Sequence, residues 1–240
     1  MAGIGPDMRI LDVGCGAGDV ALQAAAITGP GGYVLGVDED PDVLAVAAQR
    51  AREAGLRNVT FKRARVPDEV GAVLDEPVDA VVGRLILLHL DDPVGAVAAL
   101  SRLVCPGGLL TFQEFNVSHG RCVPPSPLMD LCMQWVTKAL QAAGRPTEAG
   151  EQLFSIFREA GLPLPKLAAM APVSADREVI EYVADTVASL LPLMKKVNVV
   201  SQDQDVENLA ERLYAVIVET GAAVILPELA AAWACTPAQR

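Results

Sequence analysis

Histidine and positive charge are both scarce in this sequence. The chain of 240 residues has 2 histidines, His89 and His119, and 5 cysteines that show no paired spacing of metal ligands. A structural zinc site is therefore not expected, and no other metal centre is predicted. Lys and Arg number 19 against 30 Asp and Glu, which gives a formal net charge of −11. That balance argues against a nucleic-acid partner, because phosphate backbones attract basic surfaces.

Export and membrane signals are not found in the sequence either. No basic segment followed by an apolar stretch opens the chain, so a signal peptide is not predicted. No apolar run approaches the roughly 18 residues that a membrane-spanning helix needs. The odd number and unpaired pattern of the cysteines predict a reduced protein. Since neither a signal peptide nor a membrane-spanning helix is predicted, we expect it to be cytoplasmic and not to bind membranes.

Apolar residues, by contrast, are plentiful. They make up 52% of the chain, and charged residues make up 20%. This composition is sufficient to fill a core and argues against disorder. The length is typical of one domain, or of one domain with a substantial insertion.

The stretch from Ile10 to Asp19 organises the rest of the chain. Ile10 to Val13 reads as a buried strand, and glycines follow at positions 14, 16 and 18 before an alanine-rich helix begins near Asp19. Glycine permits positive φ and lets a ligand lie against the backbone, and a helix N-terminus offers unpaired N–H groups. A strand, a glycine turn and a helix in this order predict the nucleotide-binding corner of an open α/β sheet.

Two acidic residues set this turn apart from the dinucleotide fingerprint G-x-G-x-x-G/A. Asp19 occupies the sixth position, and Asp12 lies two residues before the first glycine. Residues 12–18 instead resemble motif I, (D/E)-x-G-x-G-x-G, of the class I S-adenosylmethionine-dependent methyltransferases. The resemblance implies S-adenosylmethionine as cofactor and S-adenosylhomocysteine as product. It also implies that the following motif residues contact the cofactor: Asp12, Gly14, Cys15, Gly16 and Gly18.

An acidic residue ends the second predicted strand, which begins at Tyr33. Asp38 stands at the tip of this strand, and Glu39 follows it. One carboxylate can accept hydrogen bonds from both hydroxyls of a ribose. We favour this role for Asp38 over that of a helix cap, because Asp40 is better placed as the cap. Because NAD enzymes use an acid at the same place, Asp38 supports a nucleotide without choosing between cofactors.

Contacts to adenine are expected after the third strand, Val59–Lys62. The family often has a small residue and an acidic one there, and this sequence has Ala64 and Arg65. Arginine cannot accept a hydrogen bond from the adenine amino group, although it can stack on the ring. Backbone groups near Val66 are the expected substitute.

A longer run of the chain extends the resemblance. A strand at Val78–Gly83, a loop from Arg84 to Asp92 that contains the letters LLHL, a helix, and Pro-Gly-Gly before a strand at Leu109–Glu114 follow the family's order. With motif I and Asp38, the resemblance covers residues 8–114. Gly83 ends the fourth predicted strand and Arg84 begins the loop after it, so both are expected at the cofactor.

The predicted fold class is α/β, with a seven-stranded, mostly parallel, doubly wound sheet and a helical cap inserted in the C-terminal half. The last two strands are expected at Lys166–Ala171 and Ala223–Leu226. Apolar stripes at helical spacing predict the cap helices, which leave from the carboxyl ends of strands, where ligands bind. The expected division is 1–117 for the cofactor-binding core, 118–146 and 173–200 for the cap, and 147–172 and 201–240 for the remainder of the core.

One cap helix has side chains that suit an apolar ligand. Met129, Met133 and Trp135 follow the Ser126-Pro127 helix start, on or beside an apolar stripe. Core packing is the favoured explanation of that stripe. The same flexible methionines and the tryptophan could instead wall a substrate pocket.

Methyl transfer requires mainly that the protein position the two reactants, holding the nucleophile within about 3 Å of the methyl group and in line with it. A general base is needed only for a protonated acceptor such as a hydroxyl. The candidate catalytic residues are His119, His89 and Glu114. His119 lies in a polar loop and is preferred as the base. His89 lies in an apolar segment where a structural hydrogen bond is an equal alternative, and Glu114 could orient a neighbour instead.

Few residues precede the first strand, whereas the family usually has helices there that help to cover the cofactor. A neighbouring subunit could supply that cover, so a homodimer is considered.

The leading function is therefore methyl transfer to a small-molecule acceptor, with oxygen slightly ahead of nitrogen. Two alternatives are kept. One is an S-adenosylmethionine-binding protein that catalyses another reaction or serves as a partner subunit. The other is a nicotinamide-dependent oxidoreductase, against which Asp12 and Asp19 speak.

Overall fold

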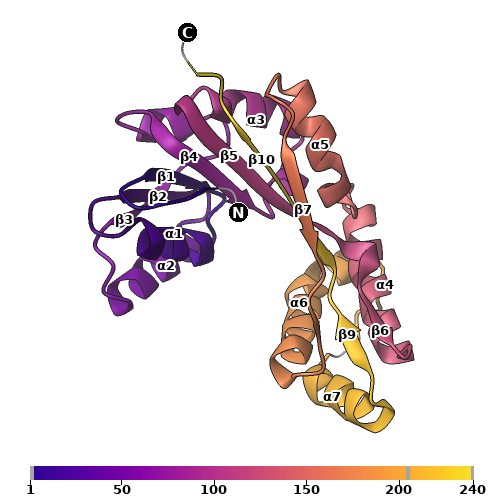
Figure 1. The fold of residues 1–240 in the computed structure, drawn as a ribbon. Coiled ribbons are helices and arrows are strands. Elements are labelled where there is room, and N and C mark those ends of the chain that lie inside the picture. Colours follow the sequence, from indigo (N-terminus) through magenta and orange to yellow (C-terminus); the bar gives the residue numbers. More distant parts are fainter. Residues whose placement is uncertain (1–2, 204–205, 239–240) are drawn as a thin grey trace. The chain divides into compact units, whose positions relative to one another are not determined.

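A computed structural model describes residues 3–203 and 206–238 of the chain. The chain divides into two compact units (Figure 1). The sheet unit comprises Met1–Glu114, Gln152–Ala168 and Ala231–Arg240, and the helical unit comprises Phe115–Glu151 and Ala169–Ala230.

A seven-stranded sheet has the strand order β3-β2-β1-β4-β5-β10-β7 (Figure 1). The pairings of β1 with β2 and β4, of β2 with β3, and of β4 with β5 are parallel. The predicted α/β fold with a seven-stranded, mostly parallel sheet is therefore confirmed. The strands are β1 (Arg9–Val13), β2 (Tyr33–Asp38), β3 (Val59–Arg63), β4 (Val78–Arg84), β5 (Val104–Asn116), β7 (Lys166–Met170) and β10 (Glu228–Cys235).

The helices beside this sheet begin at residues that favour helix starts. The Asp40 side chain accepts a hydrogen bond from the Asp42 N–H at 2.8 Å, and Asp92 accepts one from the Gly95 N–H at 2.8 Å. In both helices proline follows the cap, where its missing N–H costs nothing. The elements are α1 (Asp19–Thr28), α2 (Pro41–Glu53), α3 (Pro93–Ser101), α5 (Ala149–Glu159) and the short 3₁₀ helices η1 (Val70–Val73) and η2 (Leu87–His89).

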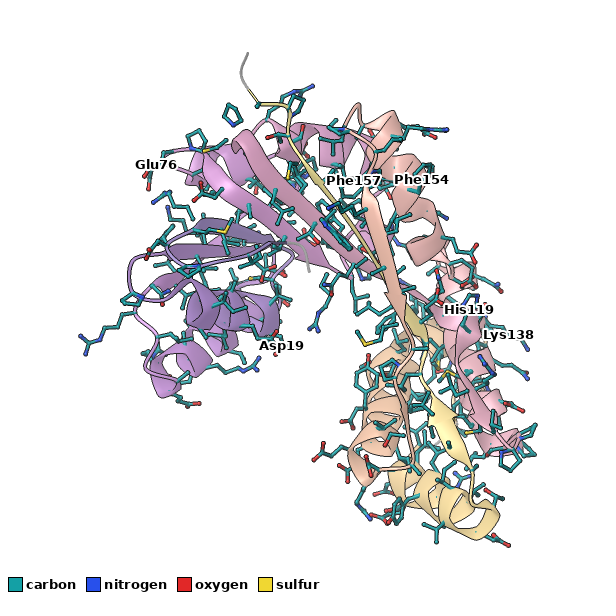
Figure 2. All side chains as sticks on the ribbon, viewed as in Figure 1. Asp19, Glu76, His119, Lys138, Phe154 and Phe157 are labelled. Carbon is teal, nitrogen blue, oxygen red and sulfur yellow. The ribbon has the colours of Figure 1, made fainter. Side chains whose placement is uncertain are left out.

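Successive residues of β5 pack on opposite faces of the sheet, as the pleat requires. Leu109 joins a core with Ile10 and the alanines of α1. Phe112 meets Phe157 of α5 edge to face, with ring centroids 6.0 Å apart. Figure 2 labels Phe157 and Phe154 on α5; Phe157 is fully buried, whereas Phe154 is 39% exposed.

The helical unit has its own core. Buried residues of α4, α6, α7 and β9 form one cluster, which includes Met129, Ile180, Leu213 and Val224. The sequence-predicted cap at Ser126 is confirmed, since its hydroxyl accepts from the Met129 N–H at 3.4 Å. The elements are η3 (Val117–His119), β6 (Arg121–Val123), α4 (Pro127–Ala142), β8 (Val173–Ser174), α6 (Arg177–Lys196), α7 (Leu209–Thr220) and β9 (Ala223–Ile225).

The prediction that Ala223–Leu226 is a strand of the main sheet is wrong. This segment forms β9, which pairs with β6 and β8 in a separate three-stranded sheet. Val224 is 1% exposed and packs into the helical core. The sheet takes its seventh strand from β10, whose sequence ELAAAWAC is rich in helix-forming alanine and was not predicted as a strand.

The predicted domain division differs from the structure in the same region. Residues 201–203 and 206–230 were assigned to the core of the sheet, yet they belong to the helical unit. The reason is packing, since Leu209, Leu213 and Ile217 of α7 bury their side chains in the helical core. Residues 204–205 and 239–240 of the predicted core range lie outside the described residues. In residues 3–203 and 206–238, no helix combines the length and the apolar content needed to cross a bilayer.

Candidate functional site

The glycine turn between β1 and α1 has the backbone conformation that its sequence predicts. Gly14, Gly16 and Gly18 have φ values of 64°, 50° and 86°, a region that side chains disfavour. A Cβ on Gly14 would lie 2.6 Å from Cδ1 of Ile86. The turn therefore packs directly against the loop that follows β4, and only glycine leaves room for that contact.

Asp38 braces the turn from the end of β2. Its Oδ2 accepts a hydrogen bond from the Gly16 N–H at 2.9 Å, and its Oδ1 accepts one from the Asp40 N–H at 3.1 Å. The carboxylate thus stands beside the glycine turn, where a ribose acceptor was predicted. Both oxygens keep lone pairs for further donors.

A cleft of about 810 Å³ opens beside Asp38. It brings together six of the residues predicted for the site, since Gly14, Asp38, Glu39, Arg65, Val66 and His89 all line it. Its other lining residues follow β3 or β4 or belong to α3, and they are Ala64, Pro67, Asp68, Leu85, Ile86, Leu90, Asp91, Asp92, Gly95, Ala96 and Ala99.

Arg65 has a partner of its own at the rim of this cleft. Its guanidinium Nη2 lies 3.0 Å from Oε1 of Glu69, and its backbone N–H donates to Oε2 of the same residue at 2.9 Å. Both side chains are more than half exposed. The Arg65 side chain is therefore held toward Glu69. Asp68, which sequence reasoning missed, places a carboxyl group at the cleft.

A smaller pocket of about 170 Å³ adjoins the glycine turn and shares Gly14 and Leu85 with the cleft. Four predicted residues line it in addition to Gly14: Asp12, Cys15, Gly16 and Arg84. Arg84 enters it from the end of β4. Among the described residues, Oδ2 of the buried Asp12 has no hydrogen-bond partner.

Burial controls the protonation of the two titratable groups beneath this pocket. It raises the pKa of Asp12 to about 7, against the opposing effects of a hydrogen bond from the Ala21 N–H and the charge of Arg84. Burial, with the Asp12 and Asp38 charges, also raises the pKa of the Cys15 thiol. Cys15 is therefore a packing residue of the turn and not a thiolate.

Arg84 and Arg50 share one carboxylate at the start of α1. Asp19 Oδ2 lies 3.2 Å from Nη2 of Arg84, and its Oδ1 lies 2.8 Å from Nη2 of Arg50. Arg50 also donates to the backbone carbonyl of Ala17 at 2.7 Å. Sequence reasoning missed Arg50, because nothing in the pattern of α2 indicates that its last turn reaches the glycine turn.

Glu114, a predicted catalytic candidate, is fully buried at the end of β5. Its Oε1 accepts from the N–H groups of Ile86 and Leu87 at 3.0 and 2.7 Å. Burial raises the pKa of Glu114 to about 7, more than these hydrogen bonds lower it. The residue therefore orients the loop after β4, which is the alternative that the sequence left open. Gly83 is also buried, and a Cβ there would lie 2.7 Å from Phe112.

His119 lies in the helical unit, between two carboxylates (Figure 2). Its Nε2 is 3.8 Å from Oε1 of Glu151, and its Nδ1 is 3.8 Å from Oε1 of Glu228. The neighbouring Asn116 is buried; it donates to Glu228 at 2.8 Å and accepts from the Glu151 N–H at 3.0 Å. His89, by contrast, belongs to the sheet unit and its cleft.

The proposed substrate residues of α4 differ in burial. Met129 is fully buried in the helical core, as the packing alternative predicts. Met133 and Trp135 are partly buried against the same core. In the described part of the chain, no group of three or more His, Cys, Asp or Glu side chains is arranged to hold a metal ion.

Comparison with known proteins identifies the family. The model of a methyltransferase domain matches residues 4–161. The chain belongs to this methyltransferase family. The predicted family is thereby confirmed, and with it S-adenosylmethionine as the cofactor of the family.

The curated relatives of this methyltransferase chain are longer than the matched region. Aklanonic acid methyltransferase DauC of Streptomyces sp. (strain C5) is 32% identical over 143 residues, which are 55% of this chain and 64% of that protein. Ubiquinone biosynthesis O-methyltransferase of Thiobacillus denitrificans is 37% identical over 108 residues, 45% of this chain and 44% of that one. The chain thus spans about half the length of the curated relatives it matches.

Solved structures share the fold over nearly the whole chain. The YcgJ protein of Bacillus subtilis is 18% identical with a TM-score of 0.60, covering 99% of this chain and 95% of that one. The (4+2)-cyclase SpnF is 21% identical with a TM-score of 0.55, covering 98% and 77%. These likenesses establish the fold and nothing further.

The residues of the sheet unit fit the cofactor of the family. S-Adenosylmethionine has a ribose diol and an amino-acid end with one positive and one negative group. Asp38 offers acceptor oxygens at the cleft, and the Asp12 carboxyl group and the Arg84 guanidinium line the adjoining pocket. The orphaned Oδ2 of Asp12 is the observation that asks for a donor at that place.

Proposed function

We propose that the protein transfers a methyl group from S-adenosylmethionine to a small-molecule acceptor, with an oxygen acceptor favoured. The single observation that carries the proposal is the glycine turn braced by Asp38 beside a cleft of about 810 Å³. The names of the relatives favour a small acceptor, since they refer to aklanonic acid and to ubiquinone biosynthesis. The ubiquinone relatives are O-methyltransferases by name.

The proposed cofactor contacts follow the two pockets of the sheet unit. Asp38, with Glu39 beside it, would accept the ribose hydroxyls at the cleft. Arg65 and the backbone at Val66 would border adenine, since both line the same cleft. The remaining predicted contacts lie at the glycine turn and the end of β4, and they are Asp12, Gly14, Cys15, Gly16, Gly18, Gly83 and Arg84.

His119 is the proposed general base for a hydroxyl acceptor. The carboxylates of Glu151 and Glu228, each 3.8 Å from one of its ring nitrogens, would stabilise the imidazolium that forms when it takes a proton. His89 is the second candidate, because it lines the cleft. Glu114 would act by positioning the cleft wall.

The acceptor pocket is proposed to involve Met133 and Trp135, which are partly buried on α4. Met129 is the packing member of the predicted trio, given its complete burial. A Met133→Ala variant should therefore alter the KM or the selectivity for the acceptor while cofactor affinity is unchanged.

The proposal is tested first by ligand binding. S-Adenosylmethionine and S-adenosylhomocysteine should raise the melting temperature, with about 2.7 kcal/mol of stabilisation at about 100 times Kd. NAD and NADP should have no effect, and a response to NAD alone would favour an oxidoreductase. Formation of S-adenosylhomocysteine in the presence of phenolic or quinol acceptors then distinguishes a methyltransferase from a protein that only binds the cofactor.

The catalytic histidine is tested by two matched variants. His119→Ala should lower kcat by about 10²- to 10⁴-fold, the usual contribution of a general base, and should not change cofactor binding. His89→Ala is the control. Retained activity in His119→Ala with loss in His89→Ala would exchange the two roles, and activity in both would mean that positioning is sufficient.

Three further proposals concern the whole protein. A homodimer is proposed, and light scattering of the purified chain tests it. A cytoplasmic location and the lack of a nucleic-acid partner are proposed from the composition, and cell fractionation tests the location.

A further inference from the structure

We infer that Arg84 anchors the carboxylate of the bound cofactor by exchanging it for Asp19, while Arg50 keeps Asp19 paired. The inference rests on the proposed function and assigns a specificity-determining residue and an internal competitor within it. Its physical basis is one carboxylate that two guanidinium groups share at the edge of a ligand pocket.

The geometry separates the two arginines. Arg50 is fixed twice, at 2.8 Å from Asp19 Oδ1 and at 2.7 Å from the carbonyl of Ala17. Arg84 makes one contact with the same carboxylate, at 3.2 Å. Arg84 also lines the small pocket, whereas Arg50 is not among its lining residues in the described part of the chain. Arg84 is therefore the arginine that can turn to a ligand.

Releasing Arg84 from Asp19 requires little free energy. The Arg84 side chain is 39% exposed and that of Asp19 is 50% exposed, and ion pairs in such settings contribute little to stability. Asp19 would retain the shorter pair with Arg50 and its favourable place in the first turn of α1. Asp19 lines the same pocket, so a ligand carboxylate there can take its place at the guanidinium with a charge-assisted hydrogen bond of the same kind.

A second group in the same pocket indicates what else the ligand carries. Oδ2 of Asp12 is buried without a hydrogen-bond partner among the described residues, and an unsatisfied buried acceptor calls for a donor. A carboxyl group and a guanidinium that line one pocket complement the ammonium and the carboxylate of an α-amino acid. The pocket therefore distinguishes ligands that have an amino-acid end from adenosine derivatives that lack one.

Isothermal titration calorimetry with two probes tests the inference. S-Adenosylhomocysteine carries the amino-acid end, and 5′-methylthioadenosine shares the adenosine and the thioether but lacks that end. Arg84→Gln should weaken binding of S-adenosylhomocysteine by about 10-fold or more, the lower end for loss of a charged hydrogen bond. Binding of 5′-methylthioadenosine should change by less than about twofold. Arg102→Gln, which removes an exposed charge that lines neither pocket, is the control.

The competitor role of Asp19 has its own variant. Asp19→Asn should leave S-adenosylhomocysteine affinity unchanged or raise it, because it frees Arg84, and the double variant with Arg84→Gln should bind as weakly as Arg84→Gln alone. Equal weakening of both probes in Arg84→Gln, no weakening of either, or weaker binding in Asp19→Asn would overturn the inference. If the unmodified protein bound neither probe, the proposed function itself would fail. Unfolding midpoints of each variant show that the fold is retained.

Discussion

Replacing Glu114 by glutamine should make the stability of the sheet unit depend less on pH. In the protein, Oε1 of Glu114 accepts from the N–H groups of Ile86 and Leu87, and Oε2 has no partner among the described residues. Glutamine keeps an oxygen for the two N–H donors and cannot ionise. Glu114→Gln therefore removes a buried charge while the loop retains its acceptor.

The magnitude follows from the pKa of Glu114, which burial raises from 4.5 to about 7. An acid whose folded pKa is raised holds its proton longer in the folded state than in the unfolded state. Its favourable contribution is complete below pH 4.5 and is lost as the pH rises to about 7. At 1.36 kcal/mol per pH unit, the loss amounts to about 3 kcal/mol. Asp12, raised from 3.8 to about 7, acts in the same direction.

Denaturant unfolding at pH 5, 6, 7 and 8 measures the effect. Trp233 packs on the core of the sheet unit and Trp135 on that of the helical unit, so fluorescence in a Trp135→Phe background reports on the sheet unit. As the pH rises, the free energy of unfolding of the protein with Glu114 should fall more steeply than that of the Glu114→Gln variant. Glu76→Gln, at a side chain that is 61% exposed, should not change the slope. Parallel profiles for Glu114 and Glu114→Gln would refute the reasoning.

Three other substitutions test the site and the core. Asp38→Ala should weaken S-adenosylhomocysteine binding by about 10- to 150-fold, and unchanged affinity in calorimetry would limit Asp38 to a turn-bracing role. Gly14→Ala places a Cβ 2.6 Å from Ile86 Cδ1 at a φ of 64°, so both the melting temperature and ligand affinity should fall. Met129→Ala should cost about 2–5 kcal/mol of stability in denaturant unfolding without changing cofactor affinity; normal stability would contradict its place in the core.

Local chemistry made the cofactor-binding half predictable from the sequence. The glycine turn, the acid at the tip of β2 and the proline-opened helices each depend on a few adjacent residues. A left-handed turn favours glycine, and a carboxylate at the carboxyl end of a parallel strand lies at the edge where ligands bind in open α/β sheets. Gly14 and Asp38 therefore came together in the structure as the sequence indicated.

The seventh strand could not be predicted by the same means. Half of residues 228–235 are alanine, which favours helices, while the short run at 223–226 has the β-branched pattern of a strand. The sheet that each segment joined depended on whether it packed in the core of the sheet unit or in that of the helical unit. Ala232 and Ala234 of β10 are buried in the sheet unit, and Val224 belongs to the core of the helical unit. Tertiary packing decided against local propensity at both places.

Two contacts that hold the loops of the site are tertiary and have no signal in the sequence. Arg50 reaches the glycine turn from α2, and Glu114 reaches the loop after β4 from β5. Neither contact has a spacing signal, since the partners lie 33 and 27 residues apart in the chain. The sequence thus indicated where the loops of the site lie, but it did not indicate what holds them.

The two buried carboxyl groups show how stability and site geometry are linked in the sheet unit. Asp12 lies in β1 and Glu114 in β5, and each accepts a backbone hydrogen bond from the segment that follows β1 or β4. Each also has an oxygen without a partner among residues 3–203 and 206–238. Apolar residues of similar size would make a more stable core at neutral pH. They would offer no acceptor to the loop at Ile86 and none to a ligand above the glycine turn. The lower stability of the sheet unit above pH 7 is therefore a physical consequence of burying these two carboxyl groups where they hold the loops of the site.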